Sequence, residues 1–588
     1  MKRLAIILSI LSFPIFSFCG TIPDSLRTNW ANPGNSGTPA IPTRILSISD
    51  FGGANDSSAD NSTALKAAID SLRGEMGVIC FPEGKFLFKK SIQLPSNTIL
   101  RGQGSEKTKI YFDLNKTGNF LYAQGVKTNI STTILSGYKK DSDTINIADS
   151  NSWAVGDYAL VKEDGNTLMD PSSTWAFQHL YQIVKIKGIA GNHLTLEKPL
   201  RLNFQSSLNP ILIKIIPVQH IGIECLSIER LDTTTSQTSS IIFGLAANCW
   251  VKGIESRNSN FGHIVLENST QCTLSGNYLH DAFQYGGGGQ GYGIVLQFGS
   301  GENLIYNNIL RHLRHCILMQ AAANGNVIAY NYTREPFWTE NFLPADAAGD
   351  IVLHGNYNFT NLIEGNICQN IIIDNSHSYN GPYNTFFRNR AEYYGIIMNT
   401  GAGDKMNFVA NEITNTNFLL GNFSLTGANF MFGNNQHGTV IPGGTTNIPE
   451  NTLIGSPFSA SIGLPYTIGI NKNDAYLRWF NASTTKTICE GNDPCAISTS
   501  LISHKQTLVL EVFPNPSTGE FTFNINSKNN SEKELSVYDI TGTVIQSYYL
   551  GSENIFKKIL NLSYLPKGTY IVILRSKEDA VYKTITLQ

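Results

Sequence analysis

The chain has 588 residues and a formal net charge of −2, with no dominant basic patch. It is longer than one ordinary domain, and its balanced charge excludes nucleic acid as an expected partner. Glycine is frequent (52 residues) and only 15% of the residues are charged, which is typical of a turn-rich β protein.

Residues 1–20 have the pattern of a secretory signal peptide, because Lys2 and Arg3 precede an apolar run that ends at Phe18. Cys19 leaves lipidation open, although the residues before it match a lipobox poorly. No other segment has the length and apolarity of a transmembrane helix. The sequence therefore predicts an exported protein without a transmembrane segment.

A recognisable opening follows. An Asp-Phe-Gly-Gly stretch at residues 50–53 precedes an amphipathic run at residues 62–72, which predicts a short helix, and strand-like pieces follow at residues 78–84 and 97–104. This opening resembles the start of the pectate-lyase-like superfamily, which includes polygalacturonases, rhamnogalacturonases and phage tailspike depolymerases. The resemblance implies a right-handed parallel β-helix whose open end is capped by the helix, as an exposed solenoid end requires.

The resemblance does not extend to the polygalacturonase reaction. Their Asn-Thr-Asp, Asp-Asp, Gly-His-Gly and Arg-Ile-Lys motifs are absent, apart from a partial match at Gly262-His263-Ile264. Their hydrolytic carboxylates are therefore not transferred to this chain.

Residues 45–480 contain a repeat with a period of 22 or 23 residues, apart from two longer coils. The phrase Asn-x-Ile-x-x-Asn at residues 303–308 returns at residues 326–331, 23 residues later (326 − 303). Looser copies begin at Asn248, Gln271, Asn361, Asn384, Asn407, Asn429 and Asn451. This period, with strand-like residues between Gly and Asn turns, predicts an all-β parallel β-helix with stacked Asn side chains. Residues 132–216 interrupt the period and predict an inserted small β subdomain.

A second strand also recurs in each coil (one turn of the β-helix). Strand alternation predicts that one face forms the core, with the inward pairs Ile264/Leu266, Ile294/Leu296, Cys316/Leu318, Ile351/Leu353 and Ile396/Met398. The opposite face is then expected to carry His263, Glu267, Gln297, His315, Asp350, His354 and Asn399.

Two coils are longer than the others, by residues around 286–289 and 336–348. Both insertions precede the second strand, so both loops are expected to leave one edge of the stack and to wall a groove. The coil between them is expected to form its floor. The residue nine positions after the first residue of each repeat is polar or ionisable in six consecutive coils. These residues are expected to stack in one column, and they are Arg257, His280, His312, Glu335, Asn370 and Tyr393.

A groove with acids, bases and aromatic faces suits an extended, acidic polysaccharide. The candidate catalytic residues are His280, Asp281, His312, His315, Glu335 and Asp350. The candidate substrate-binding residues are Arg257, Arg311, Arg314, Tyr292, Trp338, His354, His377, Arg388 and Arg390.

Two reactions and one non-enzymatic function remain open. The density of His and Arg favours a lyase or epimerase, in which His312 or His315 removes a proton beside a carboxylate that Arg257, Arg311 or Arg314 neutralises. A glycoside hydrolase would need two carboxylates, from among Asp281, Glu335 and Asp350. The alternative is a surface adhesin or glycan-binding protein. No metal site and no cofactor are predicted, calcium is left open, and the chain is expected to be a monomer.

The C-terminal part is distinct. Residues 481–511 predict a linker, in which Cys489 and Cys495 suggest a small-loop disulfide, while Cys249, Cys272 and Cys316 are expected to be buried thiols. Residues 512–588 contain Val-Phe-Pro-Asn-Pro, Val-Tyr-Asp-Ile-Thr-Gly and Leu-Pro-Lys-Gly-Thr-Tyr motifs, and their strand pattern predicts a small β-sandwich. They resemble the C-terminal sorting domain of the type IX secretion system of Bacteroidetes. The resemblance implies secretion or attachment at the outer surface, with the secretion machinery as a partner.

Overall fold

The computed structural model describes residues 20–35, 42, 44–164, 168–344, 348–417, 419–454, 472–489, 495, 508–527, 532–539, 544–576 and 580–588. The chain divides into two compact units, residues 1–498 and 499–588. Residues 1–19 of the predicted signal peptide, including Cys19, lie outside the described residues.

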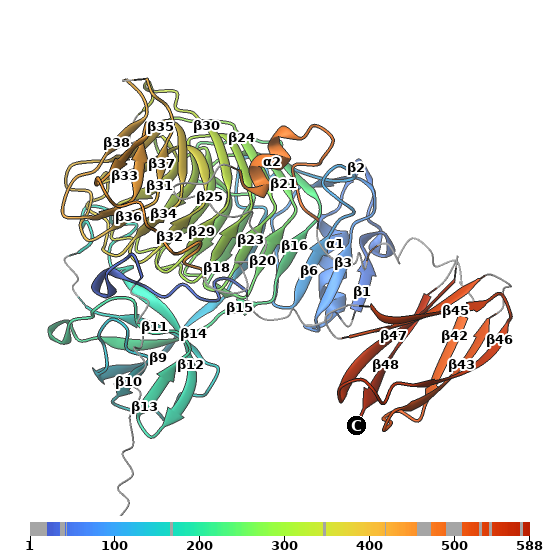
Figure 1. Ribbon diagram of the computed structural model, residues 1–588. Coiled ribbons are helices and arrows are strands. Elements are labelled where there is room, and N and C mark those ends of the chain that lie inside the picture. The colour runs from blue at the N-terminus through green and yellow to red at the C-terminus, as the bar shows by residue number, and fades with distance from the viewer. Residues whose placement is uncertain are drawn as a thin grey trace, which may run out of the picture. The chain divides into compact units, whose positions relative to one another are not determined.

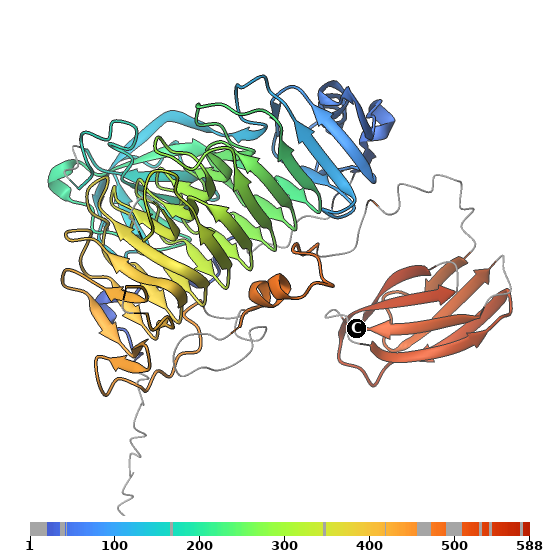
Figure 2. The ribbon, with the colours of Figure 1, turned by 90° about the horizontal axis from the view of Figure 1, so that it is seen from above.

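The first unit is built around a parallel β-helix (Figures 1 and 2). One coil consists of β26 (Leu304–Tyr306), β27 (Ile309–Leu313) and β28 (His315–Met319), and the next of β29 (Val327–Ala329), β30 (Tyr332–Pro336) and β31 (Gly349–His354). Corresponding strands pair in parallel, β26 with β29, β27 with β30 and β28 with β31. The predicted right-handed parallel β-helix is confirmed.

The predicted capping helix is also confirmed. Helix α1 (Ser62–Leu72) buries Leu65, Ala68 and Leu72 in the same apolar cluster as the first coils. It covers the core at the N-terminal end of the stack, where no earlier coil is available to do so.

Two ladders of Asn side chains run along the stack. Asn303, Asn326, Asn361 and Asn384 are linked by amide hydrogen bonds of 2.9–3.0 Å, as predicted. The second Asn of the phrase forms a longer ladder, through Asn277, Asn308, Asn331, Asn366, Asn389, Asn411 and Asn434. Each buried amide thus satisfies its neighbour, which fixes the register of successive coils.

The predicted interior is correct in most coils. In β28, Cys316 lies in the core cluster as predicted, but Leu318 faces outward, and Ile317 and Met319 face the core instead. His263 and Asp350, expected on the outer face, are fully buried. Asp350 instead accepts hydrogen bonds from the Cys316 thiol and from the backbone N–H of Gln369.

The insertion is a closed six-stranded barrel. It contains β9 (Val126–Ser136), β10 (Thr144–Ile147), β11 (Tyr158–Lys162), β12 (Tyr181–Ala190), β13 (His193–Leu196) and β14 (Ile211–Ile216). The predicted small β subdomain is therefore confirmed as part of the fold, and its apolar core is continuous with Ala321, Ala322, Tyr357 and Phe359 of the β-helix.

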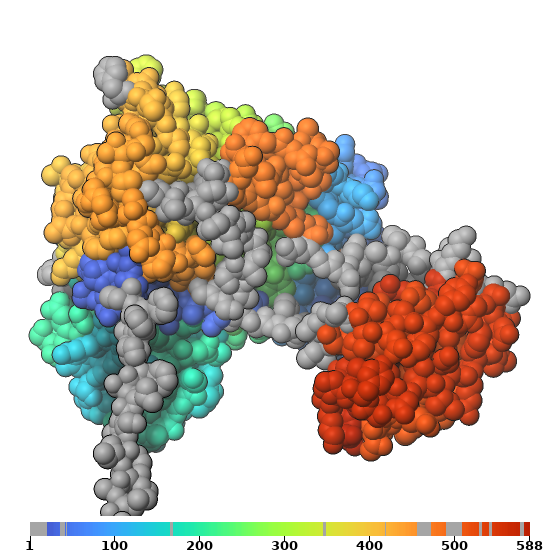
Figure 3. All heavy atoms as spheres, in the orientation of Figure 1, coloured from blue at the N-terminus to red at the C-terminus, as the bar shows by residue number. Residues whose placement is uncertain are grey.

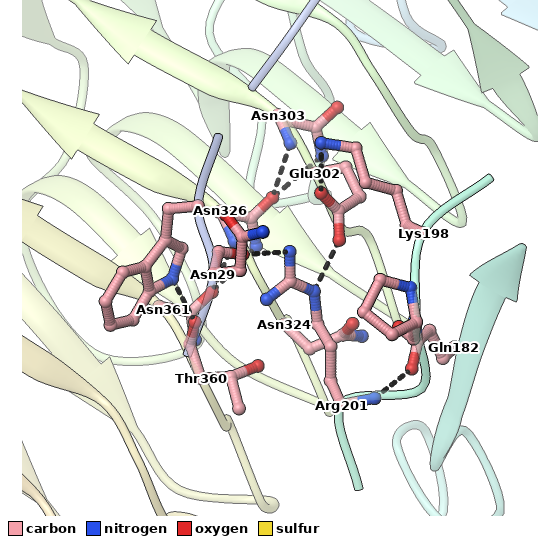
Figure 4. Close-up of polar contacts among 12 residues, drawn as sticks. Asn29, Gln182, Lys198, Arg201, Glu302, Asn303, Asn324, Asn326, Thr360 and Asn361 are labelled. Atoms are coloured by element: carbon pink, nitrogen blue, oxygen red, sulfur yellow. Dashed lines mark hydrogen bonds and ion pairs between the residues drawn. The ribbon is translucent and has the colours of Figure 1, made fainter. Parts of the chain in front are cut away.

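Buried polar contacts fix the barrel against the β-helix (Figure 4). Arg201 of the barrel forms an ion pair with Glu302 of the β-helix, and both side chains are at least 95% buried. Arg201 also donates to the carbonyl of Asn29, while the neighbouring Trp30 indole donates to the carbonyl of Thr360 at 2.6 Å. Because a buried, fully bonded ion pair tolerates little displacement, side chains of the barrel are held at set positions beside the coils.

Two disulfides fasten the end of the first unit to its beginning. Cys80 is bonded to Cys495 and Cys225 to Cys489, so the predicted Cys489–Cys495 disulfide is wrong. The two cysteines lie close in sequence, but each reaches a different early coil. Cys249, Cys272 and Cys316 are buried thiols, as predicted. Helix α2 (Asp474–Phe480), just before Cys489, lies on the surface of the β-helix (Figure 3).

The second unit is a β-sandwich. One sheet contains β42 (Leu508–Phe513), β43 (Glu520–Ser527) and β46 (Ile555–Asn561), and the other contains β44 (Lys533–Tyr538), β45 (Val544–Gly551), β47 (Gly568–Ser576) and β48 (Ala580–Leu587). Both sheets are antiparallel and enclose Phe521, Val537 and Val572. Among the described residues of both units, no helix is long and apolar enough to cross a membrane.

Candidate functional site

A groove of about 670 Å³ lies on the outward face of the second strands of the coils. It extends over β18 (Ile241–Gly244), β22 (Gly262–Glu267), β25 (Tyr292–Gln297), β28 and β31. The loop containing Gly288 and Gly289 and the barrel residue Trp175 both contribute to its lining. An outward apolar stripe runs beneath, made of Val265, Val295, Leu318, Val352 and Ile372.

A polar row follows the ends of these strands. Glu267, Gln297, Gln320 and His354 occupy successive outward positions in the groove. The Gln297 amide donates to the Glu267 carboxyl at 2.7 Å, and the Gln320 amide donates to Gln297 at 2.6 Å. Burial raises the pKa of Glu267, although the hydrogen bond from Gln297 opposes this shift.

His354 is oriented by a carboxylate on the following coil. Its Nδ1 atom is 2.6 Å from Oδ2 of Asp374, and Asp374 is fully buried. A carboxylate only accepts hydrogen bonds, so Nδ1 carries the proton and Nε2 has the lone pair in the neutral ring. This arrangement suits a histidine that accepts a proton from a substrate.

A second histidine stands beside it. The ring centroids of His354 and His377 are 4.9 Å apart, and the rings are nearly perpendicular. Burial lowers the pKa of His377, with a further contribution from the neighbouring His354. His377 is therefore neutral near pH 7.

Arg314 provides the positive charge in the groove. Its guanidinium donates to the carbonyl of Gly286 and lies over the rings of Tyr292 and Trp338, with centroid distances of 5.7 and 6.0 Å. The groove thus contains Tyr292, Arg314, His354 and His377 from the predicted set, and Trp338 packs against Arg314.

His315 and His312, the predicted catalytic bases, are both packed against aromatic side chains. His315 lies on the groove side of its coil, in register with Tyr292, but it is fully buried between Tyr292 and His354, with centroid distances of 4.9 and 5.5 Å, and is therefore not exposed to a substrate as expected. Neither of its ring nitrogens has a hydrogen-bond partner among the described residues, and burial holds its pKa well below the usual value. His312 packs between Tyr285 and Phe337, at 5.0 and 4.6 Å.

The two long loops meet over the coil between them. The N–H of Gly287 donates to the Glu340 carboxyl at 2.6 Å, and the N–H of Thr339 donates to the carbonyl of Tyr285 at 3.4 Å. Both loops leave the same edge, as predicted. The intervening coil is nevertheless covered at His312 by their aromatic residues, so this part of it is not the open floor that the sequence suggested.

The remaining predicted catalytic residues lie elsewhere. His280 contacts Asp281 and Glu255, each at 3.0 Å, and Arg311 forms an ion pair with Glu335 at 2.7 Å. These side chains belong to β21 (Glu255–Ser259), β24 (Tyr278–Ala282), β27 and β30. Arg257 of β21 is 3.6 Å from Asp281. Asp350 is inside the β-helix. The predicted single strip of histidines is therefore divided between two faces.

The predicted distal arginines also lie outside the groove. Arg388 donates to the carbonyl of Glu450 at 2.9 Å and so fastens a later segment to the stack. Arg390 forms ion pairs with Glu392 and Glu412, at 3.0 and 3.6 Å. In the part of the chain that the structure describes, no three His, Cys, Asp or Glu side chains are grouped to hold a metal ion.

Comparison with family models assigns both ends of the chain. Residues 45–187 match a family described as rhamnogalacturonase A/epimerase, pectate lyase-like, and residues 511–588 match the secretion system C-terminal sorting domain. The first match covers the N-terminal part of the β-helix, and the second identifies residues 511–588 as the type IX secretion sorting domain that the sequence suggested. The chain is exported, to the cell surface or into the medium. No curated protein matches it.

Several solved structures resemble the chain at low sequence identity. The tailspike protein gp49 from Pseudomonas phage LKA1 is 11% identical, with 92% of this chain and 98% of that chain covered and a TM-score of 0.47. The gp54 tailspike of Acinetobacter baumannii bacteriophage AP22 is 11% identical, with 92% and 96% covered and a TM-score of 0.42. An exopolygalacturonase from Thermotoga maritima is 13% identical, with 70% and 95% covered and a TM-score of 0.36.

Proposed function

We propose that the protein is a secreted polysaccharide-acting enzyme that removes a proton from a uronate sugar, with His354 as the base. The observation that carries the proposal is the His354–Asp374 pair in a groove that also contains Arg314. The family match of residues 45–187 supports a polysaccharide as the substrate.

The reaction begins at the carbon next to the sugar carboxylate. Nε2 of His354 takes the proton from this carbon, and Asp374 stabilises the imidazolium that forms. In a lyase, the electron pair left on the carbon forms a C=C bond while the neighbouring glycosidic C–O bond breaks, and the leaving oxygen is then protonated. In an epimerase, a proton returns to the opposite face of the same carbon.

Removal of this proton requires stabilisation of the negative charge on the carboxylate. Arg314 is the cationic side chain that lines the groove, and its position is fixed by Gly286. An arginine can pair with both carboxylate oxygens, which stabilises the charge that develops during proton removal.

The distance between the carboxylates along the polar row of the groove, Glu267 and Asp374, disfavours a hydrolase that uses this row. Glu267 and Asp374 lie on strands four steps apart, or about 19 Å at the usual strand spacing. Glycosidases place their two carboxyl groups about 5–9.5 Å apart. Asp374 is moreover fully buried and bonded to His354.

The test is a panel of acidic and neutral polysaccharides incubated with the wild-type protein and with His354→Ala. Unsaturated uronate, detected by ultraviolet absorbance and lost in the variant, supports a lyase, while a changed uronate configuration without cleavage supports an epimerase. Reducing ends without unsaturated product would overturn the proposal in favour of hydrolysis. Binding without any chemical change would favour an adhesin.

A further inference from the structure

A segment of the inserted barrel reaches the groove. Residues 168–178 lie between β11 and β12, and Trp175 in this segment is 39% exposed while lining the groove. The Trp175 ring packs against Phe298 of the β-helix, with a centroid distance of 6.1 Å, and is nearly perpendicular to the ring of His377, with a centroid distance of 5.2 Å. The tryptophan is therefore partly packed and partly available to a ligand.

The same segment orients His377. The Ser173 hydroxyl donates to Oδ2 of Asp170 at 2.8 Å, and its oxygen lies 3.1 Å from Nδ1 of His377. A hydroxyl has one proton, which here is given to the carboxylate, so Nδ1 of His377 must be the donor. Nε2 of the neutral His377 is consequently the acceptor nitrogen, as it is in His354.

Contacts with the β-helix hold this segment in place. The N–H of Asp170 donates to the Asn356 side chain at 3.1 Å, and the N–H of Asn356 donates to the carbonyl of His377 at 2.7 Å. Met169 and Ala176 are buried in one cluster with Tyr357 and Phe359 of the β-helix. The segment between these anchors is positioned before any ligand binds.

We propose that residues 170–175 of the barrel form a sugar subsite of the groove, in which Trp175 stacks on a pyranose ring and Nε2 of His377 accepts a hydrogen bond from a sugar hydroxyl. A pyranose ring has a flat C–H face and a rim of hydroxyls. An exposed indole next to a fixed acceptor is complementary to both. The inference rests on the proposed function only in taking a polysaccharide as the ligand.

The subsite joins two parts of the chain that are far apart in sequence. Trp175 and Ser173 come from the barrel, and His354 and His377 come from two later coils. His377 links the two groups, since it contacts both Trp175 and His354. A sugar on Trp175 would therefore be adjacent to the sugar from which His354 removes a proton.

The first experiment measures binding of oligosaccharides of polygalacturonate and alginate to the full chain, by calorimetry. Trp175→Ala is expected to weaken the affinity about tenfold, or about 1.4 kcal/mol. Phe342→Ala is the control, because Phe342 is 92% exposed on the loop after β30 and does not line the groove. Equal affinities of Trp175→Ala and the wild type would overturn the subsite, as would absence of binding of either oligosaccharide to the wild type.

The second experiment tests the orientation of His377 by ¹⁵N NMR of histidine-labelled protein, which needs no substrate. The wild type is expected to show the Nδ1–H tautomer at His377, and Ser173→Ala should shift the ring toward the other tautomer. A wild-type Nε2–H tautomer would overturn the acceptor role. If Trp175→Ala loses affinity but no polysaccharide is converted, the subsite stands and the proposed reaction fails. If conversion depends on His354 but affinity is independent of Trp175, the reaction stands and the subsite fails.

Discussion

Nδ1 of His354 lies 2.6 Å from Oδ2 of Asp374, which follows it by one coil in the stack and is fully buried. The other Asp374 oxygen accepts the N–H of Ser376 at 2.9 Å, so the carboxylate cannot rotate without losing a bond. The stacking of coils therefore sets the orientation of the histidine, because the partner is supplied by the next turn of the chain.

Asp374→Asn is expected to lower kcat by about 10²- to 10⁴-fold with little change in KM, because an amide cannot stabilise the imidazolium as a carboxylate does. The measurement is steady-state kinetics on the polysaccharide that the wild type converts. Asp143→Asn, on an exposed barrel turn, is the control and should keep the wild-type kcat. An unchanged kcat in Asp374→Asn would show that His354 does not act as the base.

The buried Asp350 should make stability dependent on pH. Burial raises its pKa from 3.8 to about 6, against the opposing effect of hydrogen bonds such as that from Gln369. Because the folded-state pKa is the higher one, the native state binds the proton more tightly, and its stabilisation is present below about pH 4 and is lost as pH rises through about 6. Glu364, whose pKa burial also raises to about 6, contributes in the same direction.

Asp350→Asn should therefore reduce the fall in the free energy of unfolding between pH 4 and pH 7, measured by urea denaturation at each pH. Glu75→Gln, at an exposed carboxyl, is the matched control and should leave the fall unchanged. The part due to Glu364 is expected to remain in Asp350→Asn. A pH dependence identical to that of the wild type would contradict the assignment.

The longer Asn ladder should contribute strongly to stability. Asn331 accepts two hydrogen bonds from Asn308, at 2.9 and 3.0 Å, and donates to Asn366 and to the carbonyl of Ile305. Asn331→Ala leaves these buried partners unsatisfied and should cost about 2–5 kcal/mol of unfolding free energy, since each orphaned group costs about 1–3 kcal/mol. The exposed Asn192→Ala, measured alongside, should cost less than about 1 kcal/mol.

Removal of residues 499–588 should block export without unfolding the first unit, because the two units have separate cores. The expected result is that the truncated protein accumulates inside the cell envelope, as measured by fractionation and immunoblotting. Circular dichroism of the purified truncated protein should show an intact β-helix. Export at the wild-type level would contradict the role of the sorting domain.

The repeat predicted the fold well because its Asn residues have the same role in each coil, which is to form side-chain hydrogen bonds to the next coil. The phrase at Asn303 and Asn326 marks the same turn in each coil, and the ladders follow it. The register was less predictable where another residue takes the place of Asn. Cys272, not Gln271, is equivalent to Asn303, since its N–H donates to the Asn303 side chain.

The site was harder to predict because the chain turns sharply within β24, β27 and β30, one residue before each strand ends. Asp281, His312 and Glu335 have φ angles of 58°, 51° and 59° and mark this turn, so the strand column is formed instead by Arg257, His280 and Arg311. When the inward–outward alternation of side chains is counted across such a turn, the residues after the turn are assigned to the wrong face. Trp175 and Ser173 gave no signal, since they lie in an irregular segment whose docking depends on the tertiary fold.

The disulfides Cys80–Cys495 and Cys225–Cys489 enclose sequence separations of 415 and 264 residues, which include every strand that forms the groove. A protease that cuts the chain between Cys225 and Cys489, for instance at the loop after β30, would produce two fragments that both bridges still connect. Only reduction would release them. An exported protein of this design can thus survive a nick in a surface loop as one covalent molecule, with its coils kept together.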